Sequence, residues 1–130
     1  MNNSEIIKLE HVFKMLGNRK RLALLVYLLN GKASINVLSQ ALAIPYKTAE
    51  RNLIHLVEAG FLSRYTDNRK VIYSINSNAA IHYAILMSII RDRCRDIDVK
   101  ELAKSLIKTA KKIDSKHAYL RGTVTQVIQK

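Results

Sequence analysis

Apolar residues recur at steps of three and four along the first half of the chain, the spacing that places side chains on one face of a helix. Asn18 can cap a helix, and Pro45 can open another. Only four glycines and one proline occur in 130 residues, so few interruptions are expected. The pattern predicts helices over residues 5–16, 18–29, 34–43 and 45–58, the third beginning at Ser34 or Asn36.

The periodicity changes after residue 60. Two short runs rich in β-branched and aromatic residues, 62–66 and 71–75, flank Asp67-Asn68, a pair typical of turns. This pattern favours a β-hairpin. The segment from Asn76 to Asn78 closes the hairpin before the chain returns to helix.

The last third of the chain is predicted to be helical again. Residues 79–95 are apolar on nearly every side, and a helix of that kind must be covered on two faces. Asp98 and Glu101 fit a capping pair for a final helix to Ile113. Its apolar residues form a narrow stripe, so we expect it to pack beside the preceding helix and extend a subunit interface. Its lysines are either a solvated face or contacts to DNA phosphates, and residues 114–130 fit helix, strand or a frayed tail.

The order of these elements predicts a winged helix-turn-helix, a mainly α fold with a small β-hairpin and additional C-terminal helices. The deciding feature is the tight connection from Leu42 to Pro45. We assign residues 1–78 to a winged helix-turn-helix DNA-binding domain that includes the N-terminal helix, and residues 79–130 to a C-terminal helical dimerisation segment. The inner faces of the helix pair are Ile35, Leu38 and Leu42 on its first helix and Ala49, Leu53 and Leu56 on its second.

Charge narrows the choice of partner. Lys and Arg number 22 against 10 Asp and Glu, a formal net charge of +12. Such a charge favours nucleic acid first and an anionic membrane surface second. The longest apolar run, Leu22 to Leu29, is far shorter than the roughly 20 residues needed to cross a bilayer. With no secretion signal visible and a single cysteine, the sequence predicts a basic, soluble, cytoplasmic domain.

Four groups of residues resemble the ArsR-like winged-helix repressors, although MarR-like and PadR-like regulators share several of them. They cover roughly Leu16 to Asn76, just under half of the chain. The resemblance implies a homodimeric regulator that binds a pseudo-palindromic operator in double-stranded DNA, with the first helix and residues 79–95 at the two-fold interface. The groups are Leu16-Gly17-Asn18 with Arg21-Leu22 and Leu24-Leu25; Ser34-Ile35 with Leu38, Ala41-Leu42 and Ile44; Thr48-Ala49 with Arg51, Leu53, Leu56 and Glu58-Ala59-Gly60-Phe61-Leu62; and Arg69-Lys70-Val71 with Tyr73 and Ile75.

Two surfaces are the predicted DNA contacts: the outer face of the fourth helix and the tip of the wing. Readout of this kind uses the first turns of the second helix of the pair, where Arg51 can pair with guanine and Glu50 can accept from cytosine. The alternatives are a solvated helix face with Glu50 in an ion pair, and a hairpin kept soluble by its charges. The predicted residues are Tyr46, Lys47, Thr48, Glu50 and Arg51 on the helix, and Arg64, Arg69 and Lys70 on the wing.

Metal sensing is the best-known activity of the resembled family, but the ligands that it uses are missing from the matching positions. Ser34 and Asn36 stand where one site of that family has a Cys-x-Cys pair, and Arg93 stands where a partner for His82 would fall. We therefore expect no regulatory metal and no cofactor. Cys94 lies among arginines, which favour a reactive thiolate, so a redox switch and a buried structural cysteine are the two interpretations.

No arrangement of residues typical of an enzyme occurs in the sequence, which contains no phosphate-binding glycine loop, nucleophile elbow or His-Glu metal helix. Two other functions fit the same fold. One is an architectural, nucleoid-type DNA-binding protein with little sequence preference. The other is a winged helix that binds an acidic protein partner. The sequence identifies no small-molecule effector.

Overall fold

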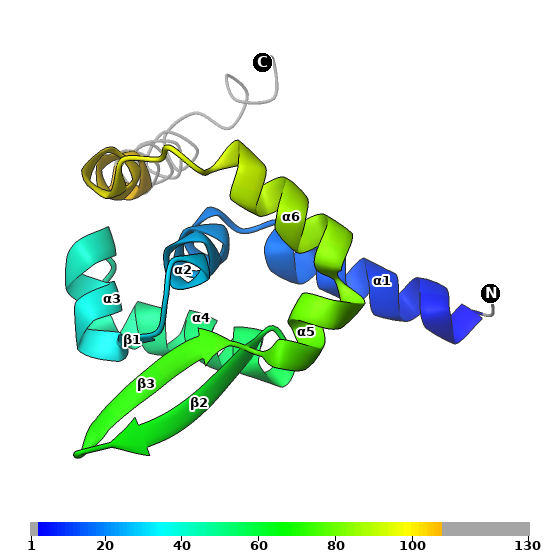
Figure 1. Ribbon diagram of the computed structural model, residues 1–130, viewed down its shortest axis with the longest axis horizontal. Coiled ribbons are helices and arrows are strands. Elements are labelled where there is room, and N and C mark those ends of the chain that lie inside the picture. Colours follow the sequence, from blue (N-terminus) through cyan, green and yellow to red (C-terminus); the bar gives the residue numbers. More distant parts are fainter. Residues whose placement is uncertain (1–2, 108–130) are drawn as a thin grey trace, which may run out of the picture.

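Helices and a small antiparallel sheet make up the computed structural model, which describes residues 3–107 (Figure 1). The strands follow the order β1-β3-β2 in the sheet, and residues 99–107 are helical. This is the winged helix-turn-helix architecture predicted from the sequence. The labelled elements are α1 (Asn3–Leu16), α2 (Arg19–Leu29), β1 (Ala33–Ser34), α3 (Ile35–Leu42), α4 (Tyr46–Glu58), β2 (Leu62–Asp67), β3 (Lys70–Ile75), α5 (Ser77–His82) and α6 (Ala84–Arg93).

Two helices begin at the capping residues that the sequence predicts. The Asn18 side chain accepts a hydrogen bond from the Arg21 amide at 3.1 Å, and Ser34 Oγ accepts one from the Val37 amide at 3.2 Å. Such caps satisfy amides that have no partner within the helix. Of the two predicted starting points for α3, the structure therefore selects Ser34. The fourth helix begins directly after Pro45, as expected.

The α3–α4 pair buries the two apolar faces that the sequence predicts. In the connecting turn, Ala43 adopts a left-handed conformation with φ of 53°. The Ile44 amide donates to the Ser39 carbonyl at 3.0 Å, and Ser39 Oγ donates to the Ile44 carbonyl at 2.6 Å. These two bonds close the turn. The buried residues are Ile35, Leu38, Leu42, Ala49, Leu53 and Leu56.

The wing turns one residue later than predicted. Each strand is one residue longer than expected, and Asp67 lies opposite Lys70 in the ladder. The turn residues are Asn68 and Arg69, with φ of 48° and 65°. Positive φ at both positions is typical of the type I′ turn, whose twist matches that of a hairpin. The prediction of Asp67-Asn68 as the turn pair is therefore wrong by one position.

The sequence pattern does not indicate β1. This strand has two residues, Ala33 opposite Tyr73 and Ser34 opposite Ile72. Two residues are too few to show an alternation of apolar and polar side chains, so only the pairing with β3 defines the strand. The pairing ties the segment between α2 and α3 to the wing.

The prediction of one helix over residues 79–95 is wrong. The segment forms α5 and α6, which meet at Tyr83, where φ is −115° and ψ is 34°. The Tyr83 ring stacks on Phe61 with centroids 5.0 Å apart and planes 21° apart. We attribute the break to this packing, since no glycine or proline marks it. Helix α5 also begins earlier than the predicted residue 79, because the Asn76 side chain caps it. This side chain accepts a hydrogen bond from the Ala79 amide at 3.3 Å.

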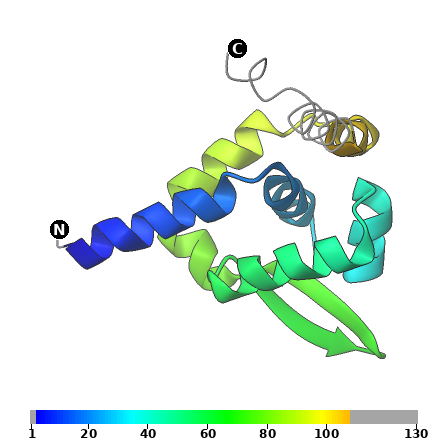
Figure 2. The ribbon, with the colours of Figure 1, turned by 180° about the vertical axis from the view of Figure 1, so that it is seen from behind.

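The helix at residues 99–107 packs against the body of the domain. Leu106 belongs to the central core cluster, and Val99 and Leu102 pack against that cluster. Both views place this helix near α3 (Figures 1 and 2). Packing of the stripe onto the body is thus shown for these three residues, but the helix lies near α3 and not beside the preceding helix as predicted. Its expected part in a subunit interface stays a prediction, and Ala110 and Ile113 lie outside the described residues.

The predicted cap of this last helix is half confirmed. Asp98 accepts a hydrogen bond from the Lys100 amide at 2.9 Å. Glu101 pairs with Lys104 at 3.4 Å instead of closing the box with Asp98.

Met87 of α6 and Leu106 share the core cluster with the winged-helix residues, so the core extends past residue 78. No helix within residues 3–107 is long and apolar enough to span a membrane.

Leu106 and Ile107 provide a matched pair for testing the docking. Leu106 is 3% exposed and Ile107 is 42% exposed. We expect Leu106→Ala to lower the free energy of unfolding by about 2–5 kcal/mol, because it leaves a cavity in the core. Ile107→Ala should change it by less than about 0.5 kcal/mol. Urea unfolding measures both, and equal effects would show that the helix is not docked through Leu106.

Candidate nucleic-acid interface

The fourth helix and the wing lie on one side of the molecule. Figures 1 and 2 show α4, β2 and β3 together there, while α6 and the helix at residues 99–107 lie on the opposite side. The antiparallel hairpin projects beyond the helical body. A helix beside a projecting hairpin is the arrangement that a winged helix-turn-helix offers to one face of a DNA duplex.

The outer face of α4 carries the predicted contact residues. Lys47 and Arg51 are exposed, and Tyr46 is 43% exposed. Thr48 and Glu50 are half-buried at the edge of this face. All five predicted side chains therefore lie on or beside the solvent-facing side of the helix, opposite the buried inner face.

The charged residues of this face have no ionic partner within residues 3–107. The ion pairs there join neighbouring residues of α1, of the α6 end and of the helix at residues 99–107. None involves Lys47, Glu50 or Arg51, so the ion pair considered for Glu50 is not formed. The α4 N-terminus also has no side-chain cap, because Pro45 precedes it. The first amides of α4 can therefore donate hydrogen bonds to an anion.

The structure separates the three wing residues that the sequence groups at the tip. Arg69 lies in the turn, and Lys70 begins β3 next to it. Arg64 lies instead in the middle of β2, opposite Tyr73. The prediction that places Arg64 around the tip is therefore wrong, because the hairpin turns three pairs further along the ladder.

Tyr73 connects the wing to α4. The ring is almost fully buried. This burial raises the pKa of the Tyr73 hydroxyl above its usual value of 10.0, and the positive charge and hydrogen bond of Arg64 oppose the rise. Glu50 and Tyr46 of α4 raise the pKa further through their charges. The charges of α4 and of β2 thus both act on the Tyr73 hydroxyl.

Arg69 occupies a conformation that suits glycine. Its φ of 65° is left-handed, and it holds the second position of the type I′ turn, where glycine is preferred. An L-residue in this region costs roughly 1–2 kcal/mol. Residues in such conformations cluster at functional sites. The arginine side chain therefore occupies the wing tip at a cost in stability.

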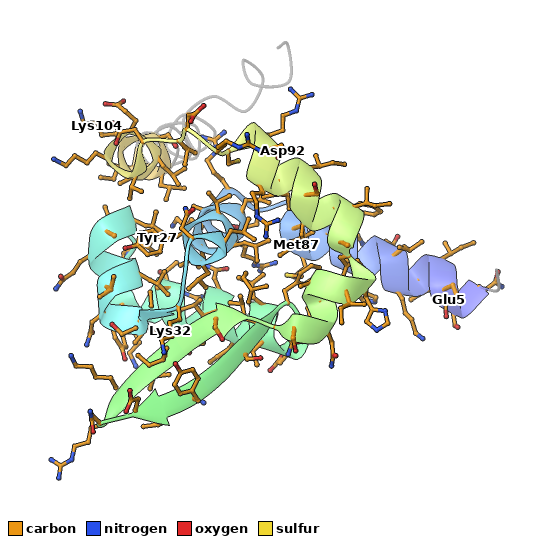
Figure 3. The ribbon with its side chains drawn as sticks, viewed as in Figure 1. Glu5, Tyr27, Lys32, Met87, Asp92 and Lys104 are labelled. Atoms are coloured by element: carbon orange, nitrogen blue, oxygen red, sulfur yellow. The ribbon has the colours of Figure 1, made fainter. Side chains whose placement is uncertain are left out.

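Lys32 contacts the wing through Tyr65, in the middle of β2. Lys32 Nζ lies 5.9 Å from the centroid of the Tyr65 ring, a cation–π distance. Figure 3 shows Lys32 between α2 and the wing. Its stacking on β2 places it on the same side of the molecule as the wing.

An arginine and an asparagine link α2 to the middle of α4. Arg21 Nε donates to Asn52 Oδ1 at 2.9 Å, and Asn52 Nδ2 donates to the Thr48 carbonyl at 3.0 Å. The sequence analysis misses this pair. The available signal is that Asn52 falls on the apolar face of α4, three residues after Ala49, and a buried amide needs a partner.

The remaining candidates are the potential metal ligands and Cys94. Within residues 3–107, no three His, Cys, Asp or Glu side chains gather where they could hold a metal ion. Cys94 is half-buried and forms no disulfide. It lines a cavity of about 180 Å³ together with Arg91 and Arg95, two of the arginines that flank it in the sequence.

The lysines of the last helix are partly described. Lys104 is exposed and pairs with Glu101. Figure 3 shows Lys104 at the top of the view, on the side away from the wing, whose tip lies at the bottom. This position favours the solvated face over the DNA contact that the sequence analysis leaves as an alternative for these lysines. Lys108 and Lys111 lie outside the described residues.

Exposed apolar side chains lie on α1 and on the α5–α6 segment. The most exposed of these are Ile85 of α6, at 80%, and Ile81 of α5, at 73%. Large apolar patches are unusual on the surface of a soluble monomer. This is the surface that the sequence analysis assigns to a two-fold interface. Its exposed members are Ile6, Ile7, Leu9, Phe13, Ile81, Ile85 and Ile89.

No family model matches this chain, and no curated protein matches it. Solved structures match its fold. HlyU from Vibrio cholerae N16961 aligns with a TM-score of 0.61 at 20% identity, over 70% of this chain and 96% of HlyU. A homodimeric winged helix-turn-helix DNA-binding domain from Mycobacterium bovis, described as part of a possible ArsR-family transcriptional regulator, aligns with a TM-score of 0.60 at 20% identity, over 75% and 94%. The transcriptional repressor BigR from Xylella fastidiosa aligns with a TM-score of 0.55 at 23% identity, over 71% and 95%. These matches confirm the winged helix-turn-helix fold that the resemblance implies.

The raised pKa of Tyr73 predicts how stability depends on pH. A tyrosine in the unfolded chain loses its proton first as the pH rises, because burial raises the pKa in the folded chain. The contribution of Tyr73 to the free energy of unfolding is thus fully present below about pH 10, the pKa in the unfolded chain. It is lost as the pH rises from that value through the higher pKa of the folded chain. We expect the free energy of unfolding of the wild type, relative to Tyr73→Phe, to be constant up to about pH 9 and to fall above about pH 10. Urea unfolding across this range measures it, with the exposed Tyr65→Phe as control. Parallel curves for wild type and Tyr73→Phe would contradict the assignment.

Proposed function

We propose that this protein is an ArsR-like transcriptional regulator that binds a specific pseudo-palindromic operator in double-stranded DNA as a homodimer in the cytoplasm. The proposal rests on one observation: the exposed charges of α4, which have no ionic partner within residues 3–107, lie on the same side of the molecule as the left-handed Arg69 of the wing tip. We assign the chain no catalytic role and no metal or other cofactor.

The fourth helix supplies the base contacts in this proposal. Arg51 is exposed without an ionic partner in the described chain, and it can donate two hydrogen bonds to the O6 and N7 atoms of guanine. Glu50 can accept from the N4 amino group of cytosine. Tyr46 and Thr48 flank them and can contact a thymine methyl group or a phosphate. Lys47, next to the uncapped N-terminus of α4, can neutralise a phosphate.

The wing supplies backbone and minor-groove contacts. Arg69 and Lys70 lie at the tip of a projecting hairpin, where positive side chains suit the minor groove or the phosphates that line it. Retention of arginine at a glycine-favouring position supports a role for its side chain beyond solubility. Arg64, further back along β2, can contact the DNA backbone between the wing and α4.

A second copy of the chain covers the apolar surface of α1, α5 and α6 in this proposal. Burial of that surface stabilises a dimer through the hydrophobic effect. A two-fold axis then places two copies of α4 about one helical turn of DNA apart, so a pseudo-palindromic site is expected. The homodimeric state of the Mycobacterium bovis domain supports this arrangement.

The function is tested by selecting bound duplexes from a random pool and competing the selected site against bulk DNA. A regulator should favour its site by about 10³-fold or more. Arg51→Ala should then lose about 1–3 kcal/mol on the selected site and relax the preference at one base pair. Binding without preference would identify an architectural protein. A failure to bind any duplex at low salt would favour a protein-interaction module.

Arg69→Gly should have opposite effects on stability and on DNA binding. Glycine removes the strain of the left-handed conformation, which stabilises the folded chain, but it also adds conformational entropy to the unfolded chain. The net result should be a rise of about 0.5–1 kcal/mol in the free energy of unfolding. Losing the charge should weaken binding to all duplexes and reduce the slope of log K against log salt by about 1. Lys104→Ala removes one charge on the opposite side and should leave this slope unchanged. An unaltered slope in Arg69→Gly would place the wing tip off the DNA.

Ile85→Glu should dissociate the dimer. The substitution would bury an unpaired carboxylate between the two copies, and such a charge is strongly destabilising. Sedimentation at several protein concentrations measures the dissociation. Val37→Glu, at an exposed apolar position on α3, is the control and should leave the dimer intact. If Ile85→Glu sediments like the wild type, α6 is not at the interface.

A further inference from the structure

The first helix is fixed to the described chain at its C-terminal end. Residues 3–11 are exposed, Leu16 is buried, and Val12 and Met15 pack against the core. Figure 3 shows Glu5 at the far end of α1, well away from the body. An open cleft of about 480 Å³ separates α1 from the end of α4 and is lined by Lys8, His11, Val12, Met15, His55, Glu58, Ala59 and Tyr83. Side-chain packing therefore holds the C-terminal end of α1, which we call its base, but does not fix the tilt of the helix relative to α4.

One side chain joins the base of α1 to α4. Arg21, in the first turn of α2, donates from Nη1 to the Met15 carbonyl at 3.2 Å and from Nε to Asn52 Oδ1 at 2.9 Å. Asn52 is only 8% exposed and donates in turn to the Thr48 carbonyl. A continuous series of hydrogen bonds therefore runs from the last turn of α1 to the first turns of α4.

The guanidinium group suits this connection better than any other cation. Its nitrogens lie in one plane at fixed angles, so two acceptors bonded to it are held in a fixed relative orientation. Both acceptors of Arg21 are neutral oxygens, and no carboxylate pairs with it within residues 3–107. A partly buried cation without a counter-ion has a desolvation cost. Ion-pair stabilisation therefore does not account for its position.

We infer that Arg21 is a positioning residue, which sets the angle between the dimer helix α1 and the recognition helix α4 and thereby the operator half-site spacing that the protein accepts. This inference rests on the proposed function for the roles of the two helices. The fourteen residues of α1 make a lever about 21 Å long. A tilt of about 10° at its base moves its far end by about 3.5 Å, close to the rise of one base pair.

The angle is measured without DNA by placing spin labels on α1 and α4. Glu5→Cys and Ile54→Cys in a Cys94→Ser background provide the two sites, and dilution with unlabelled chain isolates the distance within one subunit. We expect a narrow distance distribution for the parent and a broader one for Arg21→Lys, which keeps the charge but loses the planar fork. Ser39→Ala is the control, because it removes a hydrogen bond from the α3–α4 turn without touching α1.

A double variant, Arg21→Met with Asn52→Leu, guards against loss of folding. Replacing both partners by apolar groups can be nearly neutral for stability. The double variant should therefore fold while showing the broad distribution. If it and Arg21→Lys both keep the parent's narrow distribution, the inference is wrong.

Binding to DNA gives the second readout. Affinity is measured for the selected operator and for a copy with one base pair inserted between its half-sites. The parent should bind the original spacing more tightly. That preference should fall roughly tenfold in Arg21→Lys, the factor that one charge-assisted hydrogen bond is typically worth. An unchanged preference would overturn the link to spacing. If the parent shows no sequence preference at all, the proposed function fails, while the distance measurement still decides the role of Arg21.

Discussion

Burial of one face of α4 is the constraint on which the other features depend. Ala49, Leu53 and Leu56 are fully buried, so the rotation of this helix about its axis is fixed. Because a helix turns by about 100° per residue, the same rotation directs Lys47 and Arg51 into solvent. It also turns Asn52 inward, where the amide requires a partner and finds Arg21. The apolar core therefore determines both which charges are free to bind and how the helix is connected to α1.

Much of the fold could be predicted because its signals are local. Capping residues such as Asn18 and Ser34 mark helix starts within a few residues, and the runs of β-branched and aromatic residues that form the hairpin are visible in a short window. The features that the sequence does not reveal depend on residues far apart. The break at Tyr83 follows from stacking on Phe61, and β1 exists only through its pairing with β3. Neither leaves a pattern in its own segment.

The candidate site divides in the same way. The outward face of α4 follows from periodicity alone, since Ala49, Leu53 and Leu56 define the inward side. The position of Arg64 does not, because it depends on where the hairpin turns, and that is decided by the dihedral angles of Asn68 and Arg69. The Arg21–Asn52 contact spans 31 positions. A buried asparagine in an apolar stripe shows that some partner is needed without identifying which residue it is.

Ser34 takes part in two elements at once. Its backbone pairs with Ile72 in the sheet, and its hydroxyl caps α3 through the Val37 amide. Melting of the wing would remove the ladder partner that holds this residue in an extended conformation, and the first turn of α3 would lose its cap with it. The wing and the start of the helix-turn-helix should therefore open as one cooperative unit, with similar protection of their amides against hydrogen exchange. The wing and the first turn of α3 would then share a single local stability.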